Sequence, residues 1–200
     1  GTVNTAGQPF NGFRDFVRRV GETPFYAEGI VIAGARVEDA EVVGNEITSA
    51  QHGVRLAASS RNDRNPPNWR QNEPSNLVVR AVVERNRIRL RPASAGLPSH
   101  GVYAGHFRSL VIQSNDIIGG RQDASDDDSL WFGIRTYGYR GHRLRISGNA
   151  IMNVATGLEV EPDLQSGDDQ WNGGSWAALG NGYRNVAVRE ILANGVISGP

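Results

Sequence analysis

The sequence predicts an all-β solenoid of about five coils, built from short strands that recur along the chain. Three observations predict it. An asparagine motif recurs with apolar residues at fixed offsets, a glycine motif recurs between its copies, and the two alternate along the chain. Strand units of fixed length, with no helical pattern between them, indicate a β-solenoid.

The asparagine motif has apolar residues five and three positions before an Asn and a β-branched residue two positions after it. Alternating apolar residues followed by Asn indicate a strand that ends in a turn. We therefore expect these asparagines to occupy the same turn of successive coils, unrelated turns being the alternative. They are Asn45, Asn86, Asn115, Asn149 and Asn194.

The glycine motif has apolar residues one and three positions after a Gly. Its copies begin at Gly29, Gly53, Gly101, Gly133 and Gly157. Gly29 precedes Asn45 by 16 residues and Asn45 precedes Gly53 by 8, so the unit has 24 residues. Gly133, Asn149 and Gly157 repeat these intervals, which predicts one coil for each pair of motifs.

This pattern resembles the right-handed parallel β-helix proteins of the pectate-lyase-like superfamily, over residues 29 to about 198. The resemblance implies a right-handed parallel β-helix with its asparagines stacked as a ladder, where a buried amide bonds the coils above and below. Several lyases of the superfamily use an arginine on one sheet and acidic residues that hold Ca²⁺. None of the family's catalytic strings is complete in this chain.

Residues 1–28 do not follow the repeat and form a separate N-terminal unit before the solenoid of residues 29–200. Asn11 is placed to cap a short helix whose apolar residues share one face, with Gly21 at its end. Such a helix would cover the exposed end of the solenoid core. A loop of a truncated coil is the alternative.

The composition excludes several classes of function. The net charge is zero, so neither nucleic acid nor an anionic membrane is favoured as a partner. There are no cysteines, and all 21 basic residues are arginines, which excludes thiol and lysine chemistry. No apolar run is long enough for a transmembrane helix. The chain begins with Gly1 and no signal-peptide pattern, so we expect a fragment of a longer protein.

Insertions into the 24-residue unit mark the loops. They fall at residues 58–75, 91–98, 119–129 and 162–182, and they carry Trp69 and Trp171. Two precede a glycine strand and two follow one, so the sheet of glycine strands is expected to form the floor of a groove walled by loops.

The floor of this groove consists of the residues two and four positions after each glycine, which point outward from the strand. Its substrate-binding candidates are Arg55, Tyr103 and Tyr137, with Trp69 and Trp171 on one wall. The column two positions after the glycines spans about 19 Å, enough for an extended chain of several sugars. An ordinary solvated sheet surface is the alternative.

The catalytic candidates are Arg135, Glu159 and Glu161 on the same floor. The two glutamates would lie about 7 Å apart, which overlaps the separation of an inverting glycosidase pair. Asp126, Asp127 and Asp128 form an acidic loop that would hold Ca²⁺, a solvated turn being the alternative.

His52 and His100 both precede a motif glycine, with Glu28 at the same position one coil earlier. We expect these side chains to stack about 5 Å apart. A hydrogen-bonded turn stack is favoured over a metal pair.

Two functions follow from these patterns. One is a glycan-binding or spacer segment of a larger extracellular or cell-surface protein, bacterial or phage, whose groove takes an acidic polysaccharide. The other is a polysaccharide lyase, hydrolase or epimerase that acts in the same groove.

Overall fold

The computed structural model describes residues 28–34, 36–49, 52–58, 77–91, 98–121, 131–160 and 175–191. Every strand pair in this part of the chain is parallel, and the same residues contain no helix. The predicted capping helix at Asn11 lies outside the described residues. Glu28, the last residue of the predicted N-terminal unit, is the first residue of β1.

The strands fall into three stacks, because each passage of the chain adds one strand to each stack. The first, the glycine stack, contains β1 (Glu28–Gly34), β4 (His52–Ala58), and the aligned parts of β7 (Ser99–Gln113), β9 (Trp131–Ser147), β10 (Ala150–Val160) and β12 (Gly182–Ile191). The second contains β2 (Arg36–Val43), β5 (Leu77–Glu84), the later parts of β7 and β9, and β11 (Ser175–Leu179). The third contains β3 (Glu46–Ser49), β6 (Arg87–Leu90), β8 (Asp116–Ile118) and the first parts of β10 and β12.

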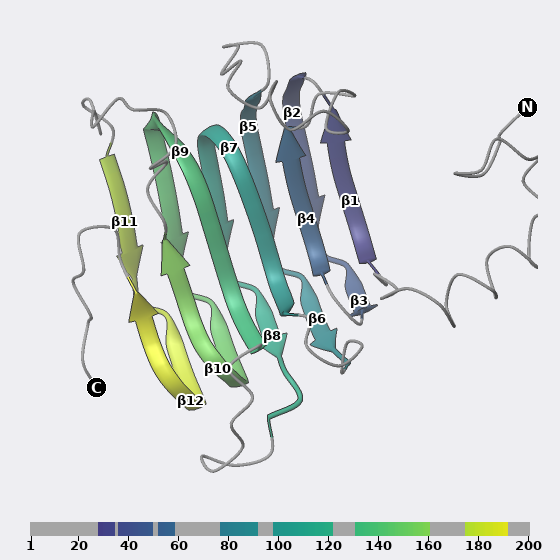
Figure 1. The fold of residues 1–200 in the computed structure, drawn as a ribbon, viewed down its shortest axis with the longest axis vertical. Coiled ribbons are helices and arrows are strands. Elements are labelled where there is room, and N and C mark those ends of the chain that lie inside the picture. Colours follow the sequence, from purple (N-terminus) through teal and green to yellow (C-terminus); the bar gives the residue numbers. More distant parts are fainter. Residues whose placement is uncertain are drawn as a thin grey trace, which may run out of the picture.

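Figure 1 shows how the stacks are arranged. Strands β1, β4, β7 and β9 lie side by side in chain order, and β2 and β5 lie behind them with their arrows reversed (Figure 1). Strands β7 and β9 turn over at the top of this view and continue into the layer behind. The chain therefore forms a solenoid-like, nearly closed arrangement of parallel strands, as the repeats predicted.

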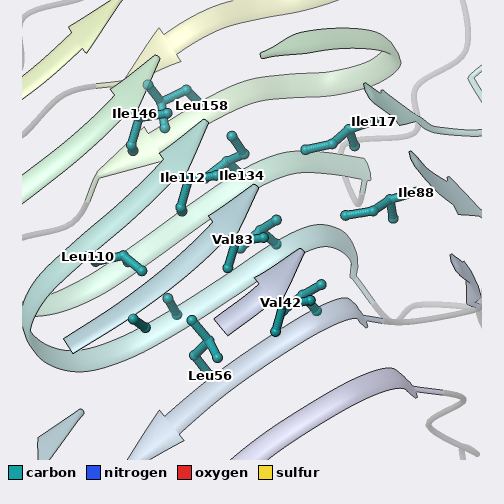
Figure 2. Close-up of a cluster of buried hydrophobic side chains, with 14 of the residues drawn as sticks. Val42, Leu56, Val83, Ile88, Leu110, Ile112, Ile117, Ile134, Ile146 and Leu158 are labelled. Carbon is teal, nitrogen blue, oxygen red and sulfur yellow. The ribbon is translucent and has the colours of Figure 1, made fainter. Parts of the chain in front are cut away.

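The core lies between the stacks and consists of equivalent residues from successive coils. Val42, Val83, Ile112 and Ile146 occupy the position three before each ladder asparagine and are in register from strand to strand. They are at most 3% exposed, and Figure 2 shows them in the interior. Because each residue packs against its copy in the next coil, the same few positions build the whole core.

The two sequence motifs meet in a single contact inside each coil. A Cβ atom placed on Gly53 would lie 2.3 Å from Cγ2 of Ile88 and 2.6 Å from the carbonyl oxygen of Gly101. Ile88 is the β-branched residue of the asparagine motif, so its methyl group occupies the space that a side chain at Gly53 would need. Gly29, Gly101 and Gly133 make the same contact with the isoleucine of their own coil. Only glycine fits this position.

The asparagines form the predicted ladder. In each step the backbone N–H and the Nδ2 of one asparagine donate to Oδ1 of the next, over 2.9 to 3.1 Å. Asn115, in the middle, is fully buried and also donates to the carbonyl oxygen of Val83 over 2.9 Å. These bonds satisfy amides that burial would otherwise make costly. The ladder runs through Asn45, Asn86, Asn115, Asn149 and Asn181.

The prediction of Asn194 as the fifth member of the ladder was wrong, because Asn181 holds that place. Asn181 follows apolar residues at the expected offsets, but Tyr183 stands two positions after it instead of a β-branched residue. Tyr183 packs against Gly157 where the earlier coils have isoleucine. The predicted loop at 162–182 was therefore too long, since β11 and the ladder turn lie inside it. Asn194 itself lies outside the described residues.

Candidate functional site

The glycine stack carries the described residues of the predicted floor, and its outward face includes further residues that the prediction left out. A strand normally alternates its side chains, so residues three apart point in opposite directions. At each motif glycine this alternation breaks: the direction of a Cβ on Gly53 and the side chain of Val54 both face the core. Consequently the residue before the glycine and the residue two after it share the outward face.

We call this surface the glycine-strand face. The residues before the glycines, in register, are Glu28, His52, His100, Phe132 and Thr156. Those two positions after the glycines are Val31, Arg55, Tyr103, Arg135 and Glu159. The two columns run side by side across the glycine stack.

Two ion pairs join adjacent strands on this face. Nη1 of Arg55 lies 2.8 Å from Oε1 of Glu28, and Nε of Arg135 lies 3.0 Å from Oε2 of Glu159. The arginine side chains are 39% and 28% exposed, respectively, and the glutamates are less exposed than their partners. Each arginine side chain is thus partly open to solvent while a carboxylate holds it in place.

A row of aromatic rings lies between the two ion pairs. The rings of His52 and His100 stack with centroids 5.1 Å apart and planes 6° from parallel, and Phe132 continues the stack 5.0 Å beyond His100. The Tyr103 ring lies against both histidines, at 5.0 and 4.8 Å. The guanidinium carbon of Arg135 lies 5.1 Å from the Phe132 centroid, a cation–π distance. The predicted stacking of His52 and His100 is confirmed, but the two side chains are in ring contact and the expected hydrogen bonding is not found within the described part of the chain.

Both histidines are buried and neutral at physiological pH. Burial lowers the pKa of His52 to about 4, although Glu28, whose Oε1 lies 3.1 Å from Nδ1, acts in the opposite direction. That contact has the distance of an ion pair without the alignment of a hydrogen bond. Burial, together with the charges of His52 and Arg135, lowers the pKa of His100 to about 3. Neither ring nitrogen of His100 has a hydrogen-bond partner among the described residues.

The remaining predicted site residues are placed only in part. Tyr137, four positions after Gly133, is in register with Gly105, four positions after Gly101, as predicted. Glu161, Trp69, Trp171, Asp126, Asp127 and Asp128 lie outside the described residues. Within the part of the chain that is described, no group of three or more His, Asp or Glu side chains is arranged to hold a metal ion.

Sequence reasoning missed that the residues before the glycines belong to the same face as the predicted floor. Strict alternation assigns Glu28, His52 and His100 to the opposite side of the strand. A signal was present, because the glycine and the apolar residue after it recur together in coil after coil. Two adjacent positions that both face a core imply a bend between them.

Comparison of the chain with protein-family models, with curated proteins and with solved structures gave no match. Within the described residues there is no helix with the length and apolar character needed to cross a membrane.

Proposed function

We propose that this chain is a right-handed parallel β-helix that serves as a glycan-binding segment of a larger extracellular or surface protein. Parallel strands in three stacks and the buried asparagine ladder support the β-helix. Its ligand is an extended acidic polysaccharide that lies across the glycine-strand face, perpendicular to the strands.

The observation that carries the proposal is the order of side chains along one column. Arg55, Tyr103 and Arg135 are consecutive in register, so the two arginines stand two strands apart, about 10 Å. This distance is comparable to two linked sugar rings. An aromatic ring between two guanidinium groups would stack on a sugar while the arginines donate hydrogen bonds to its hydroxyl or carboxylate oxygens.

The ion pairs favour binding over catalysis. Glu159 and Arg135 were predicted as separate catalytic residues, but their side chains lie 3.0 Å apart in an ion pair. A paired carboxylate has less freedom to accept or donate a proton to a substrate. The same pair fixes the Arg135 guanidinium, which lowers the entropy lost when a ligand binds.

The first experiment is a glycan-array screen of the 200-residue chain, run alongside an absorbance assay for unsaturated uronate products. Binding without product supports the proposal, and product formation would replace it with a lyase. A hexamer of galacturonic acid and its uncharged methyl ester form a matched pair of soluble probes. The acid should bind at least tenfold more tightly, since only it offers carboxylates to the arginines.

Arg135→Lys is the decisive variant, because it keeps a positive charge beside Glu159 and loses the planar fork. We expect binding of the galacturonate hexamer to weaken at least tenfold, measured by calorimetry, while the fold is retained. Arg145→Lys is the matched control, since Arg145 is an exposed arginine of the same strand in the second stack. If Arg135→Lys binds the hexamer as tightly as the parent, the glycine-strand face is not its binding site, and the chain is a spacer with no ligand on this face.

A further inference from the structure

The Tyr103 ring packs against the rings of two histidines. Its ring is tilted by 39° to that of His52 and by 44° to that of His100, with both centroids within about 5 Å. His52 is 6% exposed and His100 is 2% exposed, so their rings form a buried surface on which the tyrosine ring packs. Their contact is between ring surfaces, which packs well while both imidazoles are uncharged.

The surroundings make a charge on these histidine rings unfavourable. Arg55 from β4 and Arg135 from β9 are positive, and both lower the pKa of a neighbouring histidine. Glu28 from β1 compensates only His52, which it approaches to 3.1 Å. His100 has no acceptor for a second ring proton among the described residues, and it stacks between His52 and Phe132. A proton on His100 would therefore be buried without a partner, which is costly, so protonation favours locally open states in which the ring reaches water.

We propose that His52 and His100 are positioning residues that hold the Tyr103 ring on the glycine-strand face only while both are neutral, so that acidification releases Tyr103. The part of this inference that concerns the ligand rests on the proposed glycan-binding function: release of Tyr103 removes the stacking surface and glycan binding weakens. The lowered pKa values of the two histidines place the release below about pH 5, well outside the range in which free histidine titrates.

The test follows the free protein by NMR, with ¹³C labels in the histidine and tyrosine rings and in the isoleucine methyl groups. The Tyr103 signals are identified by their loss in Tyr103→Phe. From pH 7 downward they should stay displaced by the histidine ring currents, then move to solvent-exposed values as His52 and His100 titrate. The methyl signals of Ile112 and Ile146 should not move in the same step, because the core stays folded. Simultaneous loss of core and tyrosine signals would overturn the proposal, as would histidines that titrate at or above their ordinary pKa.

Variants separate the histidines from the carboxylate. His100→Phe places in β7 the residue that β9 already carries at the same position, and Tyr103 should then stay ordered to lower pH. Glu28→Gln should keep the transition but move it to lower pH, since it keeps both histidines and removes the carboxylate that raises the pKa of His52. If His100→Phe does not fold, His52→Gln is measured in its place. A transition unchanged in the histidine variant would overturn the proposal.

A second measurement concerns the ligand. The dissociation constant of the galacturonate hexamer is measured at pH 7 and pH 4 for the parent and for His100→Phe. We expect the parent to weaken at least tenfold more than the variant over this interval. If the parent binds no glycan at pH 7, the proposed function fails, but the NMR titration still decides whether the histidines position Tyr103. A parent and a variant with the same pH profile would overturn the coupling to binding.

Discussion

The two motifs of each coil can come into contact because the motif glycine has no side chain. A Cβ on Gly101 would lie 2.4 Å from Cγ2 of Ile117 and 2.5 Å from the carbonyl oxygen of Gly133. The second neighbour is backbone of the next coil, which cannot move without breaking the parallel pairing. The glycine is needed for close approach, since its φ does not lie in the left-handed region.

We therefore expect Gly101→Ala to destabilise the protein by about 3 kcal/mol or more, through steric conflict with the next coil. Gly182→Ala is the matched control, because a Cβ there meets no atom within 4 Å. It should be neutral or stabilise by about 0.5 kcal/mol, since alanine loses less backbone entropy on folding. Urea denaturation measures both, and similar midpoints for the two variants would contradict the contact.

At the scale of the element, the ladder turn links the coils through side chains that are otherwise unsuited to a core. Asn115 accepts from the backbone N–H and Nδ2 of Asn86 at 3.0 and 2.9 Å and donates to Asn149 Oδ1 at 2.9 Å. The residue before each ladder asparagine adopts a left-handed backbone, with φ of 53° at Arg85 and 55° at Ser114. That conformation costs roughly 1 kcal/mol or more for a residue with a side chain. The hydrogen bonds of the turn offset it.

Asn115→Ala should lower the free energy of unfolding by about 3–5 kcal/mol, because it leaves several buried donors and acceptors unsatisfied at about 1–3 kcal/mol each. Asn45→Ala, at the first described position of the ladder, should lower it by only about 1 kcal/mol. Asn45 is partly exposed, and water can replace its bonds. Thermal or urea denaturation distinguishes the two, and an equal loss for both variants would show that the ladder contributes no buried network.

The repeated elements could be predicted from the sequence where every copy of a motif has the same residue type at the same position. The ladder could be found at Asn45, Asn86, Asn115 and Asn149 because apolar phasing and a β-branched residue surround each one. The prediction missed Asn181, because the motif required a β-branched residue two positions later and a tyrosine fills that space instead. The aromatic row on the glycine-strand face was not predictable by alternation, since the bend at the glycine depends on contact with another coil.

At the scale of the whole molecule, stability should depend on pH through the two buried histidines. Their pKa values are lowered to about 4 and about 3, whereas histidine in an unfolded chain titrates near 6.5. Between these values the unfolded chain binds protons that the folded chain does not. The free energy of unfolding should therefore fall as pH falls below about 6.5, by about 1.4 kcal/mol per pH unit for each histidine. Above that pH neither histidine contributes.

Urea denaturation at pH 7 and pH 5 measures this dependence. His100→Phe should lose roughly half of the histidine contribution, about 2 kcal/mol less over the interval than the parent. Carboxylates titrate in both proteins, so the difference between the two isolates His100. An identical loss of stability in parent and variant would mean that His100 is protonated in the folded state.

Within the ladder each asparagine bonds to the asparagines of the adjacent coils, and the earlier coil is the donor in every bond between asparagine side chains. Such a molecule behaves as a one-dimensional array with nearest-neighbour coupling. Among the described coils, one at either end of the ladder has one such link and a central coil has two, so the end coils should lose order first. Disruption of the ladder at a central asparagine does more than remove one set of hydrogen bonds. It weakens the coupling between the two halves of the array, which the strand pairs of β7 with β4, β5 and β9 still join.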